Sequence, residues 1–213
     1  MFTGLIREVG TITRATAHAG GRRLLIVAPR LASELKDGDS VSVNGACLTV
    51  EALVKDGFAV YAGSETCART TLGRLPVTAA VNLEPALQAG QALGGHLVMG
   101  HVDGVGRLVS TARDGETVRM TFEAPEELLT DLVPRGAVAV DGISLTVTAV
   151  DRSGFEVAII PFTWSNTNLG RLRLGDEVNI ETDIIAKYVR RFLQGRTAPA
   201  GITEDFLREH GYL

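Results

Sequence analysis

An internal repeat limits the folds open to this sequence more than any other feature. Residues 41–84 align without a gap with residues 138–181, and 19 of the 44 aligned positions are identical. Nearer the N-terminus the offset changes from 97 to 96, so that Gly4 aligns with Gly100 and Gly10 with Gly106. A single-residue insertion or deletion between about positions 12 and 40 accounts for this change. The chain is therefore a tandem duplication of one folding unit, followed by a C-terminal tail.

The local signals inside each unit are those of short β-strands. Segments 41–50 and 138–147 are rich in Val, Leu and Thr, and the dipeptides Asn44-Gly45 and Asp141-Gly142 interrupt them. These dipeptides adopt positive φ angles easily and predict a tight turn between two strands. Further strands are expected at 24–28 and 118–122, and hairpin turns at 54–58 and 150–155. Short helical turns are expected at 32–35 and 126–129.

Six or so strands in each unit favour a small closed antiparallel barrel, which makes the chain an all-β protein. The expected domains are an N-terminal barrel at 1–96, a C-terminal barrel at 97–185 and a helical oligomerisation tail at 186–213.

The pattern after residue 183 is that of an amphipathic helix. Apolar side chains recur there at three-to-four-residue spacing, and they are Ile184, Ile185, Tyr188, Val189, Phe192 and Leu193. Gly195 and Pro199 are expected to end this helix, and residues 202–211 predict a second short helix with Thr203 as its N-cap. Two places remain open for the apolar stripe, another copy of the chain or the chain's own barrels.

Composition excludes several classes of protein. The 213 residues are 45% hydrophobic and 22% charged, which excludes a disordered or fibrous chain. A net charge of −4 with 5% aromatic residues offers no basic aromatic face for nucleic acid. No apolar run approaches the roughly 18 residues of a membrane span, and no signal peptide is visible. Because Cys47 and Cys67 form no CxxC pair, we expect a cytoplasmic protein with reduced thiols.

The residue types alone give little catalytic chemistry. His96 and His101 form an HxxxxH pattern, but this spacing places two rings on opposite faces of a strand and disfavours a metal site. Cys47 and His101 could form a nucleophilic pair, although a lone cysteine beside a turn is more often a small buried hydrophobe. Phe2 and Met99 fit core positions equally well, and no phosphate-binding loop or hydrolase elbow motif is present.

Four longer motifs carry a more specific signal. They are MFTGLI at 1–6, NGACLTV at 44–50, GGHLVMGHVD at 94–103 and DGISLTV at 141–147. Together with the duplication and the C-terminal helix, their order and spacing resemble those of the riboflavin synthases of the trimeric, duplicated-barrel type. The resemblance implies two tandem homologous six-stranded antiparallel Greek-key β-barrels plus a C-terminal α-helix, with each barrel binding one lumazine.

The activity that the resemblance implies is the last step of riboflavin biosynthesis. A four-carbon unit passes between two molecules of 6,7-dimethyl-8-ribityllumazine and gives riboflavin and 5-amino-6-ribitylaminouracil. The resemblance implies no cofactor and no metal. It implies a homotrimer in which the N-terminal barrel of one subunit faces the C-terminal barrel of its neighbour, and an association with a lumazine synthase. No nucleic-acid or membrane partner is expected.

The family pattern implies one substrate pocket in each barrel. The residues expected to line the N-terminal pocket are Gly4, Leu5, Ile6, Cys47, Leu48, Thr49, Tyr61, Ala62, Gly63, Ser64, Glu65 and Thr66. Those expected in the C-terminal pocket are Gly100, His101, Val102, Arg135, Ser144, Leu145, Thr146, Ile159, Ile160, Pro161, Phe162, Thr163 and Trp164. Strand backbone can pair with the dione edge of a lumazine, and hydroxyl and carboxyl side chains can bind its ribityl chain.

The resemblance also implies a catalytic group of Cys47, His101, Ser144, Phe2 and Asp183. Cys47 and Ser144 occupy equivalent positions in the two repeats, Cys47 as a nucleophile or a water-orienting group and Ser144 as its counterpart. His101 is the candidate for proton transfer, because an imidazole titrates near neutral pH. Phe2 belongs to an N-terminal segment that closes the site, and Asp183 is expected to bind ribityl hydroxyls.

Some positions depart from the commoner family pattern. Arg135 replaces a lysine, Ala46 stands where some members have a second cysteine, and residues 162–164 replace a more polar stretch. The alternative function is that of a non-catalytic lumazine-binding fluorescent protein of the same fold. Such proteins have usually lost the binding residues of the second barrel, whereas this chain retains His101, Ser144 and Thr146.

Overall fold

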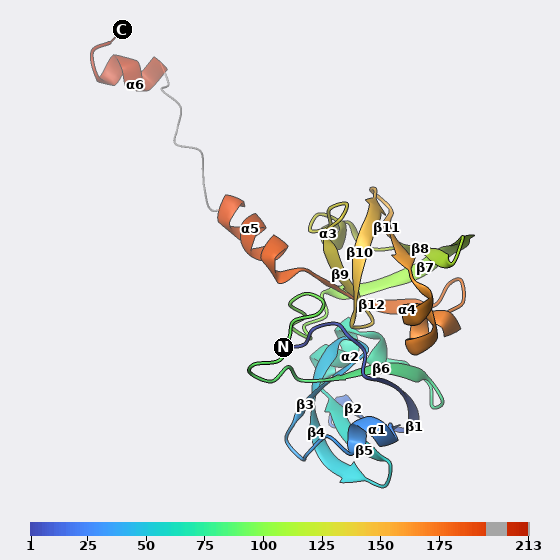
Figure 1. Cartoon of the computed structure of the whole chain (residues 1–213). Coiled ribbons are helices and arrows are strands. Elements are labelled where there is room, and N and C mark those ends of the chain that lie inside the picture. The colour runs from blue at the N-terminus through green and yellow to red at the C-terminus, as the bar shows by residue number, and fades with distance from the viewer. Residues whose placement is uncertain (195–203, 213) are drawn as a thin grey trace.

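Each repeat forms a closed barrel of six antiparallel strands, and the two barrels lie one above the other in Figure 1. The computed structural model describes residues 1–194 and 204–212. The lower barrel, called the N-barrel, consists of β1 (Glu8–His18), β2 (Gly21–Val27), β3 (Ser40–Val43), β4 (Ala46–Val54), β5 (Gly57–Ala62) and β6 (Ala80–Pro85). The upper one, the C-barrel, consists of β7 (Gly104–Asp114), β8 (Thr117–Glu123), β9 (Ala137–Val140), β10 (Ile143–Val150), β11 (Gly154–Ile159) and β12 (Glu177–Thr182).

Both barrels have the same strand order. Around the N-barrel it is β1-β2-β5-β4-β3-β6, and the corresponding strands of the C-barrel follow as β7-β8-β11-β10-β9-β12. Strands β3, β4 and β5 follow one another as antiparallel neighbours and β2 pairs with β5, which is a Greek key. The all-β architecture expected from the duplicated sequence is confirmed.

The turns expected from the Asn-Gly and Asp-Gly dipeptides are present. Asn44 and Gly45 have φ angles of 44° and 81° between β3 and β4, and Asp141 and Gly142 have 45° and 77° between β9 and β10. Both φ angles of each pair lie in the left-handed region, as a two-residue hairpin turn that follows the strand twist requires. The hairpins expected at 54–58 and 150–155 are confirmed too, between β4 and β5 and between β10 and β11.

Short helices close gaps between the strands. They are α1 (Pro29–Ala32), α2 (Ser64–Arg69), η1 (Thr71–Gly73), α3 (Glu126–Leu129), α4 (Pro161–Asn166) and η2 (Asn168–Arg171). The helical turn expected at 126–129 is confirmed, whereas the one expected at 32–35 begins three residues earlier. Pro29 starts that helix because its fixed φ suits a first helical position, and a carboxylate oxygen of Glu8 accepts the Leu31 amide at 2.7 Å.

Each barrel has its own apolar core, formed by alternate residues of its strands. In the C-barrel the rings of Phe122 and Phe155 stack with their centroids 5.6 Å apart. In the N-barrel Phe58 is fully buried among Leu24, Ile26 and other aliphatic side chains.

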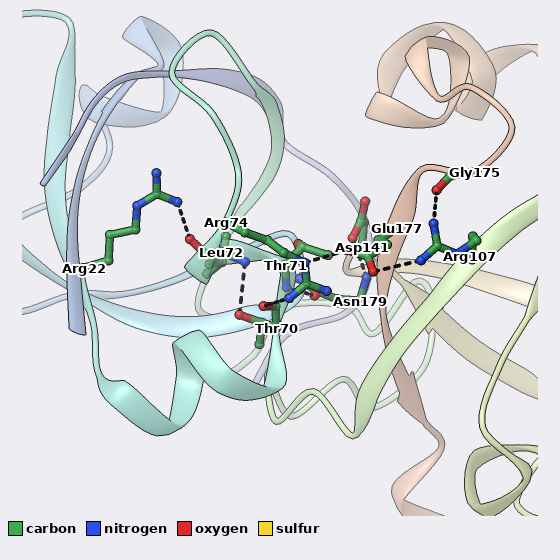
Figure 2. Close-up of polar contacts among 10 residues, drawn as sticks. All are labelled: Arg22, Thr70, Thr71, Leu72, Arg74, Arg107, Asp141, Gly175, Glu177 and Asn179. Atoms are coloured by element: carbon green, nitrogen blue, oxygen red, sulfur yellow. Dashed lines mark hydrogen bonds and ion pairs between the residues drawn. The ribbon is translucent and has the colours of Figure 1, made fainter. Parts of the chain in front are cut away.

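A buried polar junction joins the barrels where the two glycine turns meet. The side-chain amide of Asn82 in β6 donates to the Asp141 carbonyl at 3.0 Å, and that of Asn179 in β12 donates to the Asn44 carbonyl at 2.7 Å. Figure 2 shows the neighbouring contact, in which the Thr71 amide of η1 donates to Asn179 Oδ1 at 2.7 Å. The equivalent residues of the two repeats exchange bonds, so the barrels are related by an approximate twofold axis.

The C-terminal part is helical, as expected. Helix α5 (Ile184–Gln194) projects from the C-barrel with most of its apolar side chains exposed, and α6 (Glu204–Glu209) follows (Figure 1). The expected roles of Gly195, Pro199 and Thr203 fall outside the described residues. Within residues 1–194 and 204–212, no helix has the length and apolar content needed to cross a membrane.

Candidate functional site

Two extended segments run side by side between the barrels, residues 2–6 and residues 98–103. We call them the first and second crossing segments. Their backbones pair at one point, where the Phe2 amide donates to the Val98 carbonyl at 2.7 Å and the Val98 amide to the Phe2 carbonyl at 3.1 Å. Phe2 itself is fully buried beside Val98, Ala139 and Cys47. Its ring can therefore influence the site only through packing.

Each crossing segment docks on the barrel of the other repeat. The Ser144 amide of the C-barrel donates to the Gly4 carbonyl at 2.8 Å, and the Cys47 amide of the N-barrel donates to the Gly100 carbonyl at 2.9 Å. Both glycines have positive φ, 79° at Gly4 and 78° at Gly100. A Cβ at either position would lie 2.6 Å from the Cβ of Ser144 or Cys47, so only glycine allows this approach.

The sequence-based assignment of these segments to pockets is therefore wrong. Gly4, Leu5 and Ile6 were expected in the N-terminal pocket and Gly100, His101 and Val102 in the C-terminal one, and the two sets are exchanged. Ile6 packs against the core of the C-barrel, and Val102 packs against the core of the N-barrel. The repeat alignment shows which residues are equivalent, but it cannot show on which barrel a segment outside the strands will dock.

Two buried glutamates fix the crossing segments through their backbone amides. Glu84 in β6 accepts the amides of Thr3 and Gly4 at 2.7 and 2.9 Å. Glu181, the equivalent residue in β12, accepts the amides of Met99, Gly100 and His101 at 2.6, 2.9 and 3.0 Å. Burial raises the pKa of both carboxyls, although these hydrogen bonds act in the opposite direction.

The N-barrel side of the site lies on the outer face of β4. Cys47 is half-buried and Thr49 is exposed there, while Leu48 between them points into the core. Exposed His101 lies beside them, because Gly100 is bonded to Cys47. No hydrogen bond joins the Cys47 thiol to His101 in the described part of the chain, so the nucleophilic pair is not formed here.

Residues 63–66 continue this surface, whereas Tyr61 and Ala62 differ from them. Ala62 is buried, Gly63 precedes α2, and Ser64, Glu65 and Thr66 form its first turn, where Glu65 is ion-paired with Arg69. The hydroxyl of Tyr61 instead donates to the carbonyls of His18 and Ala19 at 3.1 and 3.2 Å. Tyr61 therefore covers the β1–β2 hairpin, and its expected place in the pocket stays a prediction.

The C-barrel side carries a more polar arrangement around Ser144. Nδ1 of His96 lies 2.7 Å from the Ser144 hydroxyl oxygen. Burial lowers the pKa of this imidazole, while the nearby Asp183 carboxylate acts in the opposite direction. Nε2 of His96 is buried and has no hydrogen-bond partner within the described residues. A neutral imidazole beside a hydroxyl can accept or donate a proton at that oxygen.

The other expected C-terminal residues surround this pair in different ways. Thr146 is exposed on the outer face of β10, and Leu145 and Ile159 point into the core. Ile160 and Phe162 are 55% and 74% exposed at the start of α4, where Pro161 is the first residue and Thr163 and Trp164 are half-buried. Arg135 is exposed in the turn before β9 with φ 68°, and its amide donates to the Val147 carbonyl at 2.7 Å.

Three residues of this site were missing from the expected set, namely His96, Glu84 and Glu181. The two glutamates could have been found from the repeat, because they are aligned and identical and each follows an apolar residue in a buried strand. His96 has no counterpart in the first repeat, and its HxxxxH spacing directed attention to metals. Among the described residues, no three His, Cys, Asp or Glu side chains gather as a metal ion would require.

The sequence is similar to proteins of one kind over nearly its whole length. The lumazine binding domain family matches it twice, at residues 3–86 and 99–183. A riboflavin synthase of Actinobacillus pleuropneumoniae is 37% identical, with both chains covered completely. The riboflavin synthase of Mycobacterium tuberculosis (strain ATCC 25618 / H37Rv) is 41% identical over 91% of this chain and 98% of its own. That of Bacillus subtilis (strain 168) is 37% identical over the full length of both.

Solved structures share the fold. A crystal structure of LumP complexed with riboflavin superposes with a TM-score of 0.80, at 24% identity, and covers 85% of this chain and 99% of that one. A structure of LumP with 6,7-dimethyl-8-(1'-D-ribityl) lumazine gives a TM-score of 0.78 at 23% identity. At this identity the superposition supports the duplicated barrel, and nothing more about this chain.

Proposed function

The chain belongs to the riboflavin synthase family of transferases with two lumazine binding domains, and we propose that its catalytic site forms between two subunits. The reaction is the dismutation of two molecules of 6,7-dimethyl-8-ribityllumazine to riboflavin and 5-amino-6-ribitylaminouracil. The observation that carries the proposal is the pair of equivalent junctions, Cys47 with Gly100 and Ser144 with Gly4. A reaction that consumes two copies of one molecule needs two similar pockets, and the duplication supplies them.

Exposure supports a site completed by a neighbouring chain. Thr49 and His101 on one side and Thr146 and Leu5 on the other are all exposed at the outer faces of their barrels. A heterocycle bound on such a face would keep one side of its ring in water. Placing the N-barrel of one subunit against the C-barrel of the next would cover both ligands and stack them. Holding two reactants in this way can lower the activation barrier by on the order of 7–11 kcal/mol.

The two pockets differ chemically, and donor and acceptor roles require such a difference. The C7 methyl of a lumazine is a carbon acid whose anion is delocalised into the ring system, so a positioned base is the main requirement for the donor. We assign this proton transfer to His101 or to the Ser144–His96 pair. Cys47 takes the role of nucleophile or water-orienting group at the acceptor. Asp183 caps α5 through the Ile185 amide at 2.9 Å and is also placed to bind ribityl hydroxyls.

Helix α5 supports a homotrimer. Its exposed apolar residues share one face and are Ile185, Tyr188, Val189, Phe192 and Leu193. Three copies around an axis would bury these faces together. Burying one such side chain would stabilise the assembly by about 1.5–3 kcal/mol. We further propose a cytoplasmic location, because both Cys47 and Cys67 are free thiols. Association with a lumazine synthase would supply the substrate directly.

The experiment that tests this function is a turnover assay with 6,7-dimethyl-8-ribityllumazine as the sole substrate. One riboflavin should form for every two lumazines consumed, together with one 5-amino-6-ribitylaminouracil. Tight binding without a change in the lumazine spectrum would instead support the non-catalytic alternative. Sedimentation of the same sample should give a mass of three chains.

A further inference from the structure

One ion pair joins the C-terminal helix to the second crossing segment. Nζ of Lys187 in α5 lies 2.6 Å from Oδ1 of Asp103, and each side chain is only 23% exposed. The other carboxylate oxygen of Asp103 accepts the amide and the hydroxyl of Thr182, at 2.8 and 3.1 Å. Asp103 is therefore held at three points by the end of β12 and the first turns of α5.

The same end of β12 also holds the catalytic part of the segment. Glu181, next to Thr182, accepts three successive amides that include those of Gly100 and His101. Lys187 favours the ionised form of Glu181 electrostatically, and Asp103 opposes it. The end of β12 thus fixes the backbone of residues 99–101 and also Asp103. His101 lies within this fixed stretch, so its backbone has little freedom to move. The Gly100 carbonyl is then held in a defined position, where it accepts the Cys47 amide.

The first repeat has no equivalent of this connection. Arg7 occupies the position of Asp103, and its guanidinium pairs with Glu34 at 3.2 Å, with both side chains about half exposed. Its amide donates to the Leu83 carbonyl, as the Asp103 amide donates to that of Ile180. The backbone arrangement was therefore duplicated, whereas within the described residues an ion pair with α5 exists only for the segment that carries His101.

We propose that Lys187 and Asp103 are positioning residues, which align His101 with the Cys47 pocket and connect that pocket to the assembly helix. This inference rests on the proposed function, in which His101 lies beside Cys47 and is a candidate for the proton transfer. Packing of α5 against neighbouring subunits would then fix Lys187, and through Asp103 the second crossing segment. The N-barrel pocket would reach its active geometry only in the assembled protein.

The test uses the full-length protein with Lys187→Met, Asp103→Asn and the double variant. Each is expected to lower kcat about tenfold to a hundredfold with KM changed much less, since small misplacements of a catalytic group have effects of this size. The double variant should lose no more than the worse single variant, because both changes break one connection. Lys187→Arg should restore most of kcat.

A matched control separates positioning from general support of the helix. Arg190 in α5 pairs with the buried Asp131 of the C-barrel at 3.0 Å and donates to the Thr130 hydroxyl at 3.2 Å. Arg190→Gln removes this second contact of α5 with the C-barrel and leaves the Lys187–Asp103 pair in place, so kcat should stay near the wild-type value. Equal losses in Arg190→Gln and Lys187→Met, or dissociation of Lys187→Met into single chains on sedimentation, would overturn the inference. So would wild-type kcat in Lys187→Met. Absence of turnover in the wild type would contradict the proposed function instead.

Discussion

Nδ1 of His96 lies 2.7 Å from the hydroxyl oxygen of Ser144, and burial lowers the pKa of this imidazole. In the N-barrel the equivalent of Ser144 is Cys47, whose thiol has no imidazole hydrogen-bonded to it in the described residues. The two halves of the site therefore offer different groups to two identical substrates. The duplication has produced matching backbones with different side chains at the two sites. Substitutions can therefore test each half of the site separately.

We expect Ser144→Ala and His96→Gln each to lower kcat by about a hundredfold, which is the lower end of general acid–base contributions. If the two side chains act as one unit, the double variant should be no slower than either single variant. Steady-state kinetics with the lumazine substrate provide the measurement. Thr148→Ala is the control, because Thr148 lies on the same strand and its exposed hydroxyl donates to Glu156 at 2.7 Å. Fully additive losses would show that the residues act separately.

The pH dependence of kcat should follow the His96 imidazole. Because burial lowers its pKa below the ordinary value of 6.5, the neutral form persists into mildly acidic solution. Activity should therefore fall only below about pH 6.5. Asp183 favours the protonated form, so Asp183→Asn should move the acidic fall to still lower pH while retaining a helix-capping oxygen. A fall that moves to higher pH in this variant would exclude His96 as the titrating group.

Gly100→Ala should destabilise the protein and impair the N-barrel pocket. The new Cβ would lie 2.6 Å from Cys47 Cβ and 2.8 Å from the Phe2 ring, at a φ of 78°. Gly38 provides a matched control, because it has φ 89° and no atom within 4 Å of an added Cβ. Gly38→Ala should cost only about 1 kcal/mol of backbone strain, and Gly100→Ala at least twice that. Urea denaturation measures both, and equal losses would mean that the close approach at Gly100 can relax.

The duplicated barrel, its turns and the amphipathic helix could all be predicted from local patterns, because these elements depend on residues that are near in sequence. Cys47 and Ser144 could be matched because they occupy the same position in the two aligned repeats. The docking of the crossing segments could not be predicted, since it depends on contacts such as Gly4 with Ser144 that span the whole chain.

Asp141 should make stability depend on pH. Its carboxyl is fully buried at the junction, where the Asn179 amide and the Asn168 side-chain amide donate to it at 2.8 and 2.7 Å. Burial raises its pKa from 3.8 to about 7. Between these values the folded state binds more protons than the unfolded state, so the free energy of unfolding falls as pH rises, by at most about 1.4 kcal/mol per pH unit.

Urea denaturation between about pH 5 and 8 tests this contribution. Asp141→Asn removes the titrating group and places the residue type of the equivalent Asn44 there, so the difference in stability between variant and wild type should grow in favour of the variant as pH rises. Asn44→Asp is the converse control, because it puts a second carboxyl at the junction and should steepen the loss. Parallel curves for the wild type and Asp141→Asn would show that this carboxyl does not titrate in the range.

Charges on the apolar face of α5 should prevent assembly of the subunits. Tyr188 and Leu193 lie on its apolar face and are 72% and 61% exposed. Changing both to Glu places two charges in the expected three-helix contact and should give single chains on sedimentation, while Lys187 and its bond to Asp103 remain. Such chains should still bind riboflavin on their barrels but make little of it, because each active site needs barrels from two subunits. Gln194→Glu, on the opposite face of the helix, should remain trimeric and active. A fully active single chain would show instead that one subunit contains a complete site.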